Sequence, residues 1–241
     1  MKQTVLTIIE NAPLTAGVYR MRLKGDIGEN RPGQFVNVSV PGLFLRRPIS
    51  VCDAEGDTLT LIYKVVGKGT ELMTRLPVGE KLDVLTCLGN GYDLEASAEK
   101  PLLVGGGVGV PPLYYLAKEL INQGKTVSVI LGFNKAGEIF YEDEFASLGC
   151  RVTVTTVDGS RGIRGFVTDA LPESASCFYA CGPLPMLKAL YRAADMPGEM
   201  SFEERMGCGF GACMGCSMMT KSGAKRVCKE GPVFKKEELL W

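Results

Sequence analysis

Four cysteines near the end of the chain have the residue type and spacing of metal ligands. Cys208, Cys213 and Cys216 lie in the stretch CGFGACMGC, and Cys228 follows after eleven further residues. The pattern C-x4-C-x2-C with a distant fourth cysteine is the plant-type arrangement for a 2Fe–2S cluster, in which four thiolates hold two irons. The spacing therefore predicts an iron–sulfur centre that carries one electron at a time.

Glycines are interspersed with these cysteines, at Gly207, Gly209, Gly211 and Gly215. Glycine adopts positive φ without strain and lets backbone N–H groups approach inorganic sulfide closely, where a Cβ would obstruct them. The alternatives are a structural zinc site and four unrelated thiols. A zinc ribbon pairs two C-x2-C knuckles, and here only Cys213 and Cys216 form one. The iron–sulfur interpretation is therefore favoured over zinc.

The remaining composition narrows the chemistry. The chain has 241 residues and no histidine, which excludes a Ser-His-Asp triad, a Cys-His dyad, a Cys2His2 zinc site and a Rieske centre. Its 27 basic and 27 acidic residues give zero net charge, so we expect no binding to nucleic acid. We see no secretory signal and no apolar stretch long enough to span a membrane, and we predict a cytoplasmic protein. The cysteines outside the cluster are expected to be small buried hydrophobes: Cys52, Cys87, Cys150, Cys177 and Cys181.

A glycine-rich loop in the middle of the chain could receive a dinucleotide. The stretch LLVGGGVGVPPLYYL reads as strand, turn and helix, with Gly105, Gly106, Gly107, Val108 and Gly109 in the turn. Amide groups at such a turn can hold a pyrophosphate beside the helix N-terminus. The G-x-G-x-x-G fingerprint is incomplete, because Val110 occupies its last position, and a tight packing turn would explain the loop about as well.

The placement of this loop favours nucleotide binding, since it is the first strand-to-helix turn of an alternating domain. Cys181, Gly182 and Pro183 follow a later strand, at the sheet edge where ligands bind, although they could also be a simple helix cap. The next loop, GFNKAGEIFYEDE, has one lysine, no arginine and several acids. An NADP site commonly has an arginine there, so NAD is the predicted nicotinamide.

A flavin would connect a two-electron nicotinamide to a one-electron cluster. Candidate FAD ligands lie on the strand LRRPISV, which contains Arg47, Pro48, Ile49 and Ser50. An arginine can pair with a pyrophosphate, and a serine hydroxyl can bond the edge of the ring. A second candidate segment is IYKVVGKGTELM, where a strand leads through a glycine turn to a helix that starts at Thr70. A surface arginine pair and an ordinary turn are the alternatives.

The elements that must position these residues form three regions. Residues 1–97 contain six short Val-, Ile- and Thr-rich segments, at 4–10, 18–24, 34–40, 47–53, 58–66 and 81–88. With one short helix at 70–76, they predict a small antiparallel β-barrel.

Residues 98–200 alternate strands, at 101–106, 126–133, 151–158 and 176–182, with helices, at 111–124, 141–149, 165–172 and 183–194. This alternation predicts a doubly wound parallel α/β domain. We expect 195–200 to be a linker and 201–241 to be a cluster segment with a hairpin near 221–226 and a charged tail.

The three sites in this order resemble the ferredoxin–NADP reductase superfamily. More closely, RRPIS, IYK, GKGT, GGGVGVPP, YACGPLPML, ERMGCGFGACMGC and VCKEGPVF resemble the electron transfer subunits of class 1B dihydroorotate dehydrogenase. The resemblance covers nearly the whole chain. It implies that the chain carries FAD and a 2Fe–2S cluster and oxidises NADH. It also implies electron exchange with an FMN-containing catalytic subunit that converts dihydroorotate to orotate in pyrimidine synthesis, in a heterotetramer of two copies of each chain.

The resemblance also assigns residues to the sites. FAD would be held by Arg47, Pro48, Ile49, Ser50, Ile62, Tyr63, Lys64, Gly69 and Thr70. NAD would be received by Gly105 to Gly109 and by Cys181 to Pro183, and iron by Cys208, Cys213, Cys216 and Cys228. Ile49 departs from the superfamily, which has an aromatic residue there beside the flavin ring. Trp241 is not assigned to the flavin, since a terminal residue is commonly loosely held.

Both domains of this chain already have an assigned cofactor, FAD or NAD. A catalytic (β/α)8 barrel needs roughly 250 residues, so the substrate site is expected on another chain. Soft apolar residues near the thiolates would either dock that partner or pack locally: Met206, Phe210, Met214, Met218 and Met219. The alternative functions are a similar relay for a hydrogenase, a sulfur reductase or a ferredoxin-linked transhydrogenase, and a non-redox module with structural zinc.

Overall fold

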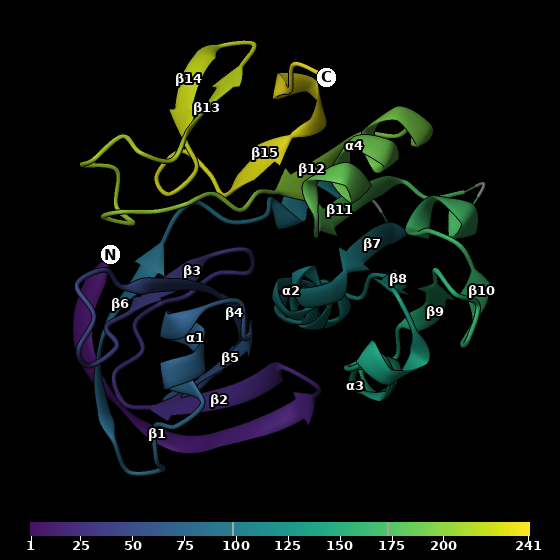
Figure 1. Ribbon diagram of the computed structural model, residues 1–241. Helices are drawn as coiled ribbons and strands as arrows, with labels where there is room; N and C mark the ends of the chain where they lie inside the picture. Colours follow the sequence, from purple (N-terminus) through teal and green to yellow (C-terminus); the bar gives the residue numbers. More distant parts are fainter. Residues whose placement is uncertain (98, 173) are drawn as a thin grey trace.

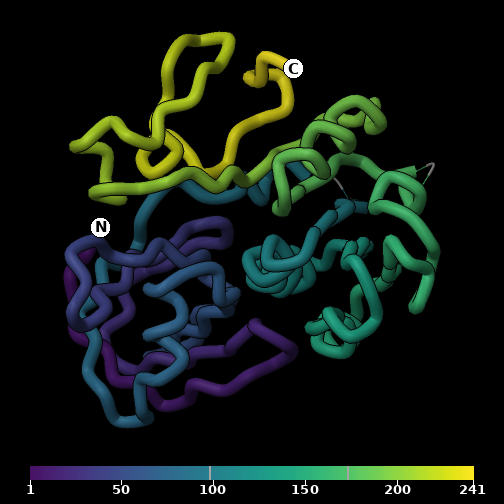
Figure 2. Tube along the Cα trace, viewed as in Figure 1, coloured from purple at the N-terminus to yellow at the C-terminus, as the bar shows by residue number. Residues whose placement is uncertain are grey.

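The computed structural model describes residues 1–97, 99–172 and 174–241. A β-barrel, an α/β layer and a C-terminal hairpin region follow one another along the chain (Figures 1 and 2). The predicted fold class is confirmed in all three parts. The predicted start of the second domain at residue 98 lies outside the described residues.

The N-terminal barrel consists of β1 (Lys2–Thr15), β2 (Val18–Lys24), β3 (Phe35–Val38), β4 (Arg47–Glu55), β5 (Thr58–Lys64) and β6 (Lys81–Leu88). These strands close in the order β1-β2-β5-β4-β3-β6, with antiparallel pairing throughout. Alternate apolar side chains such as Leu6, Ile8, Met21 and Leu23 fill its interior, as expected for strands with one face in the core. Helix α1 (Lys68–Met73) connects β5 to β6.

The second region is a seven-stranded sheet in the order β10-β9-β8-β7-β11-β12-β15. Its strands are β7 (Pro101–Gly106), β8 (Ser128–Phe133), β9 (Arg151–Thr156), β10 (Ile163–Arg164), β11 (Cys177–Cys181), β12 (Gly198–Ser201) and β15 (Val233–Lys235). Its helices are α2 (Pro111–Asn122), α3 (Glu142–Ser147) and α4 (Leu184–Ala193). All strand pairs are parallel except β12 with β15. The predicted helix at 165–172 is only a short 3-10 turn at Val167–Ala170.

The predicted linker at 195–200 is wrong in its second half. Gly198–Ser201 forms β12, which pairs in parallel with β11. Met200 is fully buried there and packs in the same cluster as Phe234. The proline and glycine of DMPGEM suggested a linker, but burial of the apolar residue against the sheet outweighs that local signal.

The charged tail joins the same sheet. Val233 and Phe234 of β15 are buried, and Met200 pairs with Phe234 across the antiparallel ladder. The predicted hairpin is present as β13 (Ser217–Thr220) and β14 (Gly223–Arg226). The cluster segment is therefore connected to the nucleotide sheet through a shared strand.

Helix α2 lies between the barrel and the sheet (Figure 1). Cys52 and Ile62 of the barrel pack in one cluster with Leu113 and Leu116 of this helix. Across the same contact, the Lys118 ammonium lies 3.2 Å from the Asp53 carboxylate, so apolar packing and a partly buried ion pair together hold the barrel against the helix. In the described parts of the chain, no helix has both the length and the apolar character needed to cross a bilayer.

Candidate functional site

The glycine loop between β7 and α2 is a close-packed turn. A Cβ on Gly109 would lie 2.2 Å from the Cys181 carbonyl oxygen, and one on Gly106 would lie 2.5 Å from the Met186 sulfur. Gly107 differs, because it has φ of +52° and nothing within 4 Å of its Cβ position. The packing interpretation thus accounts for Gly106 and Gly109, whereas Gly107 leaves open space for a ligand.

A cavity of about 580 Å³ opens in front of this loop. It is lined by Gly106 to Gly109 and Gly182 to Pro183, together with Lys64 of the barrel and Glu203 at the start of the cysteine-bearing segment. The cavity lies at the carboxyl ends of the parallel strands, where open α/β sheets bind ligands. Its size and mainly apolar lining are those of a cofactor site.

Two residues predicted for the nicotinamide lie beneath this cavity rather than in its described lining. The Cβ position of Gly105 is filled by Val110 at 2.9 Å. Cys181 is buried, and its burial raises the pKa of the thiol to about 12, so this thiol stays neutral. Both residues support the loop through backbone packing.

Several residues of the cavity were not predicted from the sequence. Asn134 and Glu138 follow β8, and the Asn134 amide donates to the Glu138 carboxylate at 2.9 Å. Phe166, Thr168, Met186 and Glu203 also line the wall. Asn134 and Glu138 lie in the stretch GFNKAGEIFYEDE that favoured NAD, so a signal was present for both, but only the fold places the other four there.

The predicted flavin residues meet at the start of β4 and the start of α1. A Cβ on Gly69 would lie 1.8 Å from Nε of Arg47. The Arg47 guanidinium therefore covers the bare backbone of this glycine. Arg47, Pro48, Ile49 and Ser50 are all half-buried, and they precede Val51 and Cys52, the two buried residues of β4. A guanidinium packed on the backbone of a glycine turn is a basic group suited to a pyrophosphate.

Other predicted flavin residues have structural roles. The Tyr63 hydroxyl donates to Asn11 at 2.9 Å from inside the barrel, and burial raises its pKa. Ile62 packs toward α2. The Thr70 hydroxyl accepts the Val66 amide at 2.9 Å and so caps α1. Of the β5 residues assigned to FAD, Lys64 is the one whose side chain is exposed and lines the cavity.

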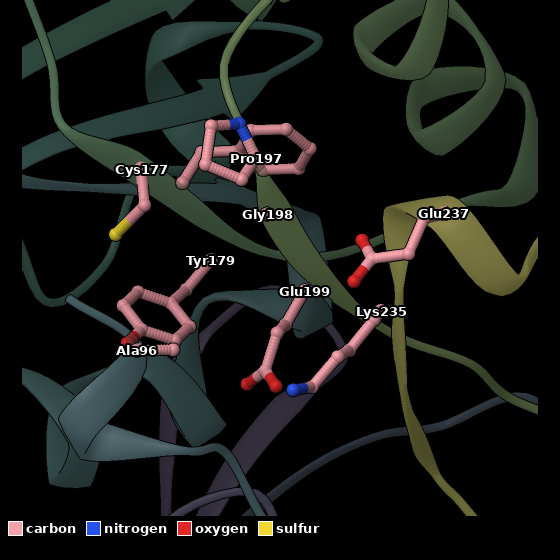
Figure 3. A pocket seen from close by; sticks show the side chains of 9 residues that line it. Ala96, Cys177, Tyr179, Pro197, Gly198, Glu199, Lys235 and Glu237 are labelled. Atoms are coloured by element: carbon pink, nitrogen blue, oxygen red, sulfur yellow. The ribbon is translucent and has the colours of Figure 1, made fainter.

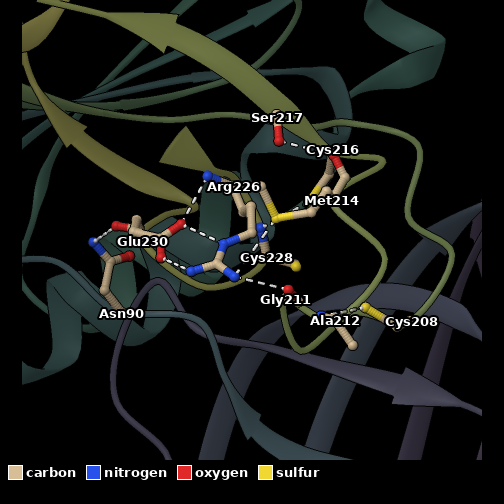
Figure 4. A network of polar contacts seen from close by, with 10 residues as sticks. All are labelled: Asn90, Cys208, Gly211, Ala212, Met214, Cys216, Ser217, Arg226, Cys228 and Glu230. Atoms are coloured by element: carbon tan, nitrogen blue, oxygen red, sulfur yellow. Dashed lines mark hydrogen bonds and ion pairs between the residues drawn. The ribbon is translucent and has the colours of Figure 1, made fainter. Parts of the chain in front are cut away.

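The four predicted iron ligands lie in the C-terminal region, and three of them, Cys208, Cys216 and Cys228, are labelled in Figure 4. Cys216 and Cys228 are buried, Cys208 is half-buried and Cys213 is exposed. The amides of Ala212 and Cys213 donate to the Cys208 sulfur at 3.2 and 3.4 Å, and the Cys228 amide donates to the Cys216 sulfur at 3.4 Å. Backbone donors thus already point at two of the four sulfurs.

These surroundings give the thiols different acidities. Burial acts to raise the pKa of Cys208, but the amides of Cys213, Phe210 and Ala212 outweigh it and lower that pKa to about 6. Burial and the neighbouring Cys216 thiol raise the pKa of Cys228 to about 12. A thiolate is the form that binds metal. Of Cys208 and Cys228, Cys208 is therefore the one that ionises more readily.

The thiols do not close around one point. Within residues 1–97, 99–172 and 174–241, no three Cys, Asp or Glu side chains are grouped closely enough to hold a single metal ion. Zinc needs four ligands about 2.3 Å from one centre, whereas a 2Fe–2S cluster spreads its four thiolates over two irons.

Side chains from outside the segment hold this loop. The Asn37 amide on β3 donates to the Cys208 carbonyl at 3.2 Å, and a Cβ on Gly209 would lie 2.4 Å from that amide nitrogen. Gly209 and Gly211 have φ of +79° and +93°, values that a side chain would strain. Asn37 gave no signal in the sequence, because it is an ordinary polar residue of a barrel strand.

The other cysteines mostly follow expectation. Cys52, Cys150, Cys177 and Cys181 are buried, whereas Cys87 is half-buried with φ of +56°. Trp241 packs against Tyr191 and Phe202, with ring centroids 5.5 Å apart in each case. The end of the chain is therefore anchored, contrary to the expectation for a terminal residue.

A second, smaller cavity of about 80 Å³ lies at the amino ends of β11 and β12 (Figure 3). Glu199 and Lys235 lie on opposite strands there, and the Asp93 amide donates to the Glu199 carboxylate at 2.8 Å. Burial raises the pKa of Glu199 to about 7. This cavity is too small for a nucleotide.

Two family models match the chain. Residues 203–240 match the iron–sulfur cluster binding domain of dihydroorotate dehydrogenase B, and residues 103–192 match an oxidoreductase NAD-binding domain. The electron transfer subunit of dihydroorotate dehydrogenase B (NAD(+)) from Geobacillus sp. (strain WCH70) is 46% identical over 100% of this chain and 99% of its own length. This chain belongs to that family of electron transfer subunits.

Other members of the dihydroorotate dehydrogenase B electron transfer family agree with this assignment. The subunit from Bacillus pumilus is 44% identical over 99% of this chain and 98% of its own length. The subunit from Fusobacterium nucleatum is 44% identical over 97% of both chains. The chain is an oxidoreductase subunit with an NAD-binding domain and an iron–sulfur binding domain.

Solved structures show how widely the fold is shared. A chain from the structure of the NADH-dependent reduced ferredoxin–NADP oxidoreductase, a flavin-based bifurcating enzyme, superimposes with a TM-score of 0.90 at 31% identity. That match covers 99% of this chain and 90% of the other. A ferredoxin NADP+ reductase from Neisseria gonorrhoeae with bound FAD and NADP matches 80% of this chain and 90% of its own, with a TM-score of 0.70 and 19% identity. The second likeness concerns the fold alone.

Proposed function

We propose that this electron transfer subunit oxidises NADH in the 580 Å³ cavity and delivers the electrons through its cysteine segment to an FMN-containing partner that interconverts dihydroorotate and orotate. The cavity lining carries the proposal. It joins Lys64 of the barrel, the loops at Gly106–Gly109 and Gly182–Pro183, and Glu203 of the cysteine-bearing segment. A bound flavin exchanges hydride with a nicotinamide and single electrons with an iron–sulfur cluster.

On the nicotinamide side of the cavity, the proposed contacts with the ligand come from the backbone of the glycine loop and from one acidic residue, Glu138. Gly107 leaves room for a pyrophosphate to approach the backbone of the loop at Gly107–Gly109. Helix α2 itself begins with Pro111 and Pro112, which have no N–H to donate. Glu138, held by Asn134, occupies the position after the second strand, where an acidic residue bonds an unphosphorylated ribose. The same carboxylate would repel a ribose phosphate, which supports NAD rather than NADP.

The flavin side acts through side chains. Arg47 over Gly69 is the proposed pyrophosphate clamp, and the Ser50 hydroxyl on the same strand is the proposed hydrogen-bond partner of the ring edge. Lys64 faces the cavity shared with the nicotinamide. Ile62, Tyr63 and Thr70 support this arrangement from within the protein.

The decisive test is Cys213→Ser, because Cys213 is an exposed predicted ligand in the cysteine loop. The chain would be co-expressed with its FMN partner and purified under argon. We expect wild type to show flavin and iron–sulfur absorbance that NADH bleaches. The variant should lose the iron–sulfur bands and at least 100-fold of NADH-driven orotate reduction, yet keep NADH-driven reduction of a soluble dye that accepts electrons from flavin.

Cys87→Ser is the matched control, since Cys87 is a half-buried cysteine outside the segment. It should keep both activities and both spectra. An undiminished rate of orotate reduction in Cys213→Ser would contradict the proposal. Transfer of electrons to ferredoxin, without any association with an FMN protein, would instead favour the relay represented by the bifurcating enzyme.

The partner would dock against the cysteine loop. Phe210, Met214 and Met219 are 43%, 55% and 63% exposed around it, whereas Met206 and Met218 pack against the core. Partner docking is therefore the explanation proposed for Phe210, Met214 and Met219, and local packing is the explanation for Met206 and Met218. Exposed soft side chains beside the exposed Cys213 suit a protein interface that receives electrons.

Phe210→Glu should weaken the complex by at least tenfold in dissociation constant while the cluster absorbance stays unchanged, because it places a charge in an apolar contact. Val78→Glu is the control, since Val78 is 65% exposed in the loop that precedes β6. Analytical ultracentrifugation would measure both affinities and would also test the proposed assembly of two copies of each chain. Equal affinity of wild type and Phe210→Glu would contradict docking at this surface.

A further inference from the structure

One cation, Arg226, connects the loop that carries the first three cysteines to the hairpin strand that precedes Cys228. Arg226, at the end of β14, donates from Nη1 to the Gly211 carbonyl at 2.8 Å. Gly211 lies between Cys208 and Cys213 in the sequence. The Met214 sulfur is 3.7 Å from the same nitrogen. The guanidinium therefore contacts the loop that carries the first three cysteines.

Arg226 also lies beside Cys216 and Cys228 along the backbone. It pairs with Ser217, the residue after Cys216, across the β13–β14 hairpin. The next residue, Val227, donates its amide to the Cys216 carbonyl at 3.0 Å, and Cys228 follows directly. Figure 4 shows the Arg226 side chain among these elements.

A single carboxylate fixes and balances this cation. Glu230 accepts Nε of Arg226 at 2.9 Å, the Arg226 amide at 2.8 Å, and Nη2 of the same guanidinium. Asn90, from the loop after the barrel, donates to the Glu230 carbonyl at 3.1 Å and to the Val233 carbonyl at 2.7 Å. The pair is thus held in one geometry by several elements (Figure 4).

We propose that the Arg226–Glu230 pair sets the reduction potential of the iron–sulfur centre, with Arg226 raising it and Glu230 lowering it. This inference rests on the proposed function, in which the four cysteines hold a 2Fe–2S cluster. One-electron reduction adds one negative charge between these thiolates. A fixed positive charge beside them favours that reduction and a fixed negative charge opposes it, since net charge and hydrogen bonding tune such potentials.

Two other cations are near but are held less firmly against the loop. The stem of Lys229 lies over Gly211, with its Cδ 2.6 Å from the glycine's Cβ position, but Lys229 is exposed. Lys225 forms its ion pair with Glu238, away from the cysteine loop. Water screens an exposed ammonium on a flexible stem, so Arg226 is the main fixed charge in this set.

The experiment measures the midpoint potential of the cluster by redox titration, followed by its visible bands and by electron paramagnetic resonance. We expect Arg226→Gln to make reduction harder and Glu230→Gln to make it easier. Each should change the reduction equilibrium on the order of tenfold, which is 59 mV for one electron. The double variant should return toward the wild-type potential.

Two further variants separate charge from structure. Arg226→Lys keeps the charge and loses the two-pronged contact, so its potential should stay nearer to wild type than that of Arg226→Gln. Lys225→Gln removes a charge at the adjacent position of the same strand and should change the potential least. A merely structural role predicts instead that Arg226→Gln and Glu230→Gln shift the potential in the same direction, because both break the same pair.

Shifts of the same sign, or shifts no larger than that of Lys225→Gln, would overturn the inference. If Arg226→Gln does not assemble a cluster, Glu230→Gln decides alone, and an unshifted or lowered potential in it refutes the proposal. A wild-type chain without iron, inorganic sulfide and the corresponding spectrum would refute the proposed function itself, which is a separate outcome.

Discussion

The two glycine-rich loops of this chain are held in opposite ways. The loop at 105–109 spans the end of β7 and the turn into α2, and its glycines other than Gly107 are packed against neighbouring elements, with the Gly109 Cβ position 2.2 Å from the Cys181 carbonyl oxygen. The loop at 207–216 follows β12, and in the described residues no helix or strand lies between Ser201 and Ser217. Side chains of Asn37 and Arg226 hold it instead.

The difference agrees with the ligand proposed for each loop. A dinucleotide is a diffusing substrate, so its site must be formed before it arrives, and regular elements supply that rigidity. An iron–sulfur cluster is resident, and its thiolate bonds become part of the fold. The nucleotide loop should therefore be sensitive to added backbone bulk, and the cysteine loop should be sensitive to loss of ligands or of its supporting side chains.

The strongest test of the nucleotide loop is Gly109→Ala. The new methyl group would overlap backbone atoms that cannot move without shifting β11, so we expect at least a 100-fold loss in the affinity for NADH. Iron and sulfide content should remain at wild-type levels. Fluorescence titration with NADH and iron analysis would measure the two properties.

Gly137→Ala is the control for this variant, because nothing lies within 4 Å of its Cβ position and its φ is not positive. Loss of iron together with NADH binding in Gly109→Ala would show that the two loops are not independent of each other.

A smaller effect, on the affinity for FAD, is expected at the proposed flavin site, where the Arg47 side chain covers Gly69. Arg47→Gln removes the charge over Gly69, and loss of a charge-assisted hydrogen bond costs about 1.5 to 3 kcal/mol. The dissociation constant of FAD should therefore rise by roughly tenfold to 100-fold. Equilibrium dialysis with apoprotein would measure it.

Arg75→Gln provides the comparison for Arg47→Gln, since Arg75 forms an exposed ion pair with Glu71 just after α1 and should not affect FAD affinity. If the two arginine variants bind FAD equally well, Arg47 is not the pyrophosphate ligand, and the flavin must depend on backbone contacts in the way proposed for the nicotinamide.

The smallest effect is on folding stability, and it arises in the sheet to which the cysteine segment is attached. Glu199 on β12 has a pKa raised to about 7, mainly by burial. Below its ordinary pKa of 4.5 the carboxyl is neutral in both the folded and the unfolded chain. As pH rises from there toward 7, the unfolded chain ionises first, so stability falls, and above pH 7 the cost is constant.

Glu199→Gln should remove this cost and still accept the Asp93 amide through its side-chain oxygen. We expect stabilisation of about 1 to 2 kcal/mol at pH 8 and little change near pH 4.5. Urea unfolding at both pH values would measure the difference. A stabilisation of the same size at both would show that ionisation of Glu199 is not its cause.

Much of the architecture could be predicted from the sequence because it depends on local patterns. Alternating Val, Ile and Thr segments predicted each barrel strand, and Pro111 marked the start of α2. The cysteine spacing matches that of a plant-type 2Fe–2S cluster, and the four ligands that it indicates stay a prediction. In contrast, β12 was mistaken for a linker, because its identity depends on pairing with β11 and β15.

The sequence by itself therefore determined which residues can do chemistry: four spaced thiols, a glycine turn before a helix, and an arginine on a barrel strand. Only the tertiary structure decided how they meet. It placed Lys64 and Glu203 on one cavity, Arg47 over Gly69, and Asn37 and Arg226 against the cysteine loop. The reason is that local spacing fixes which bonds a short segment can form, whereas contacts between distant segments depend on how the barrel, α2 and the shared sheet pack together.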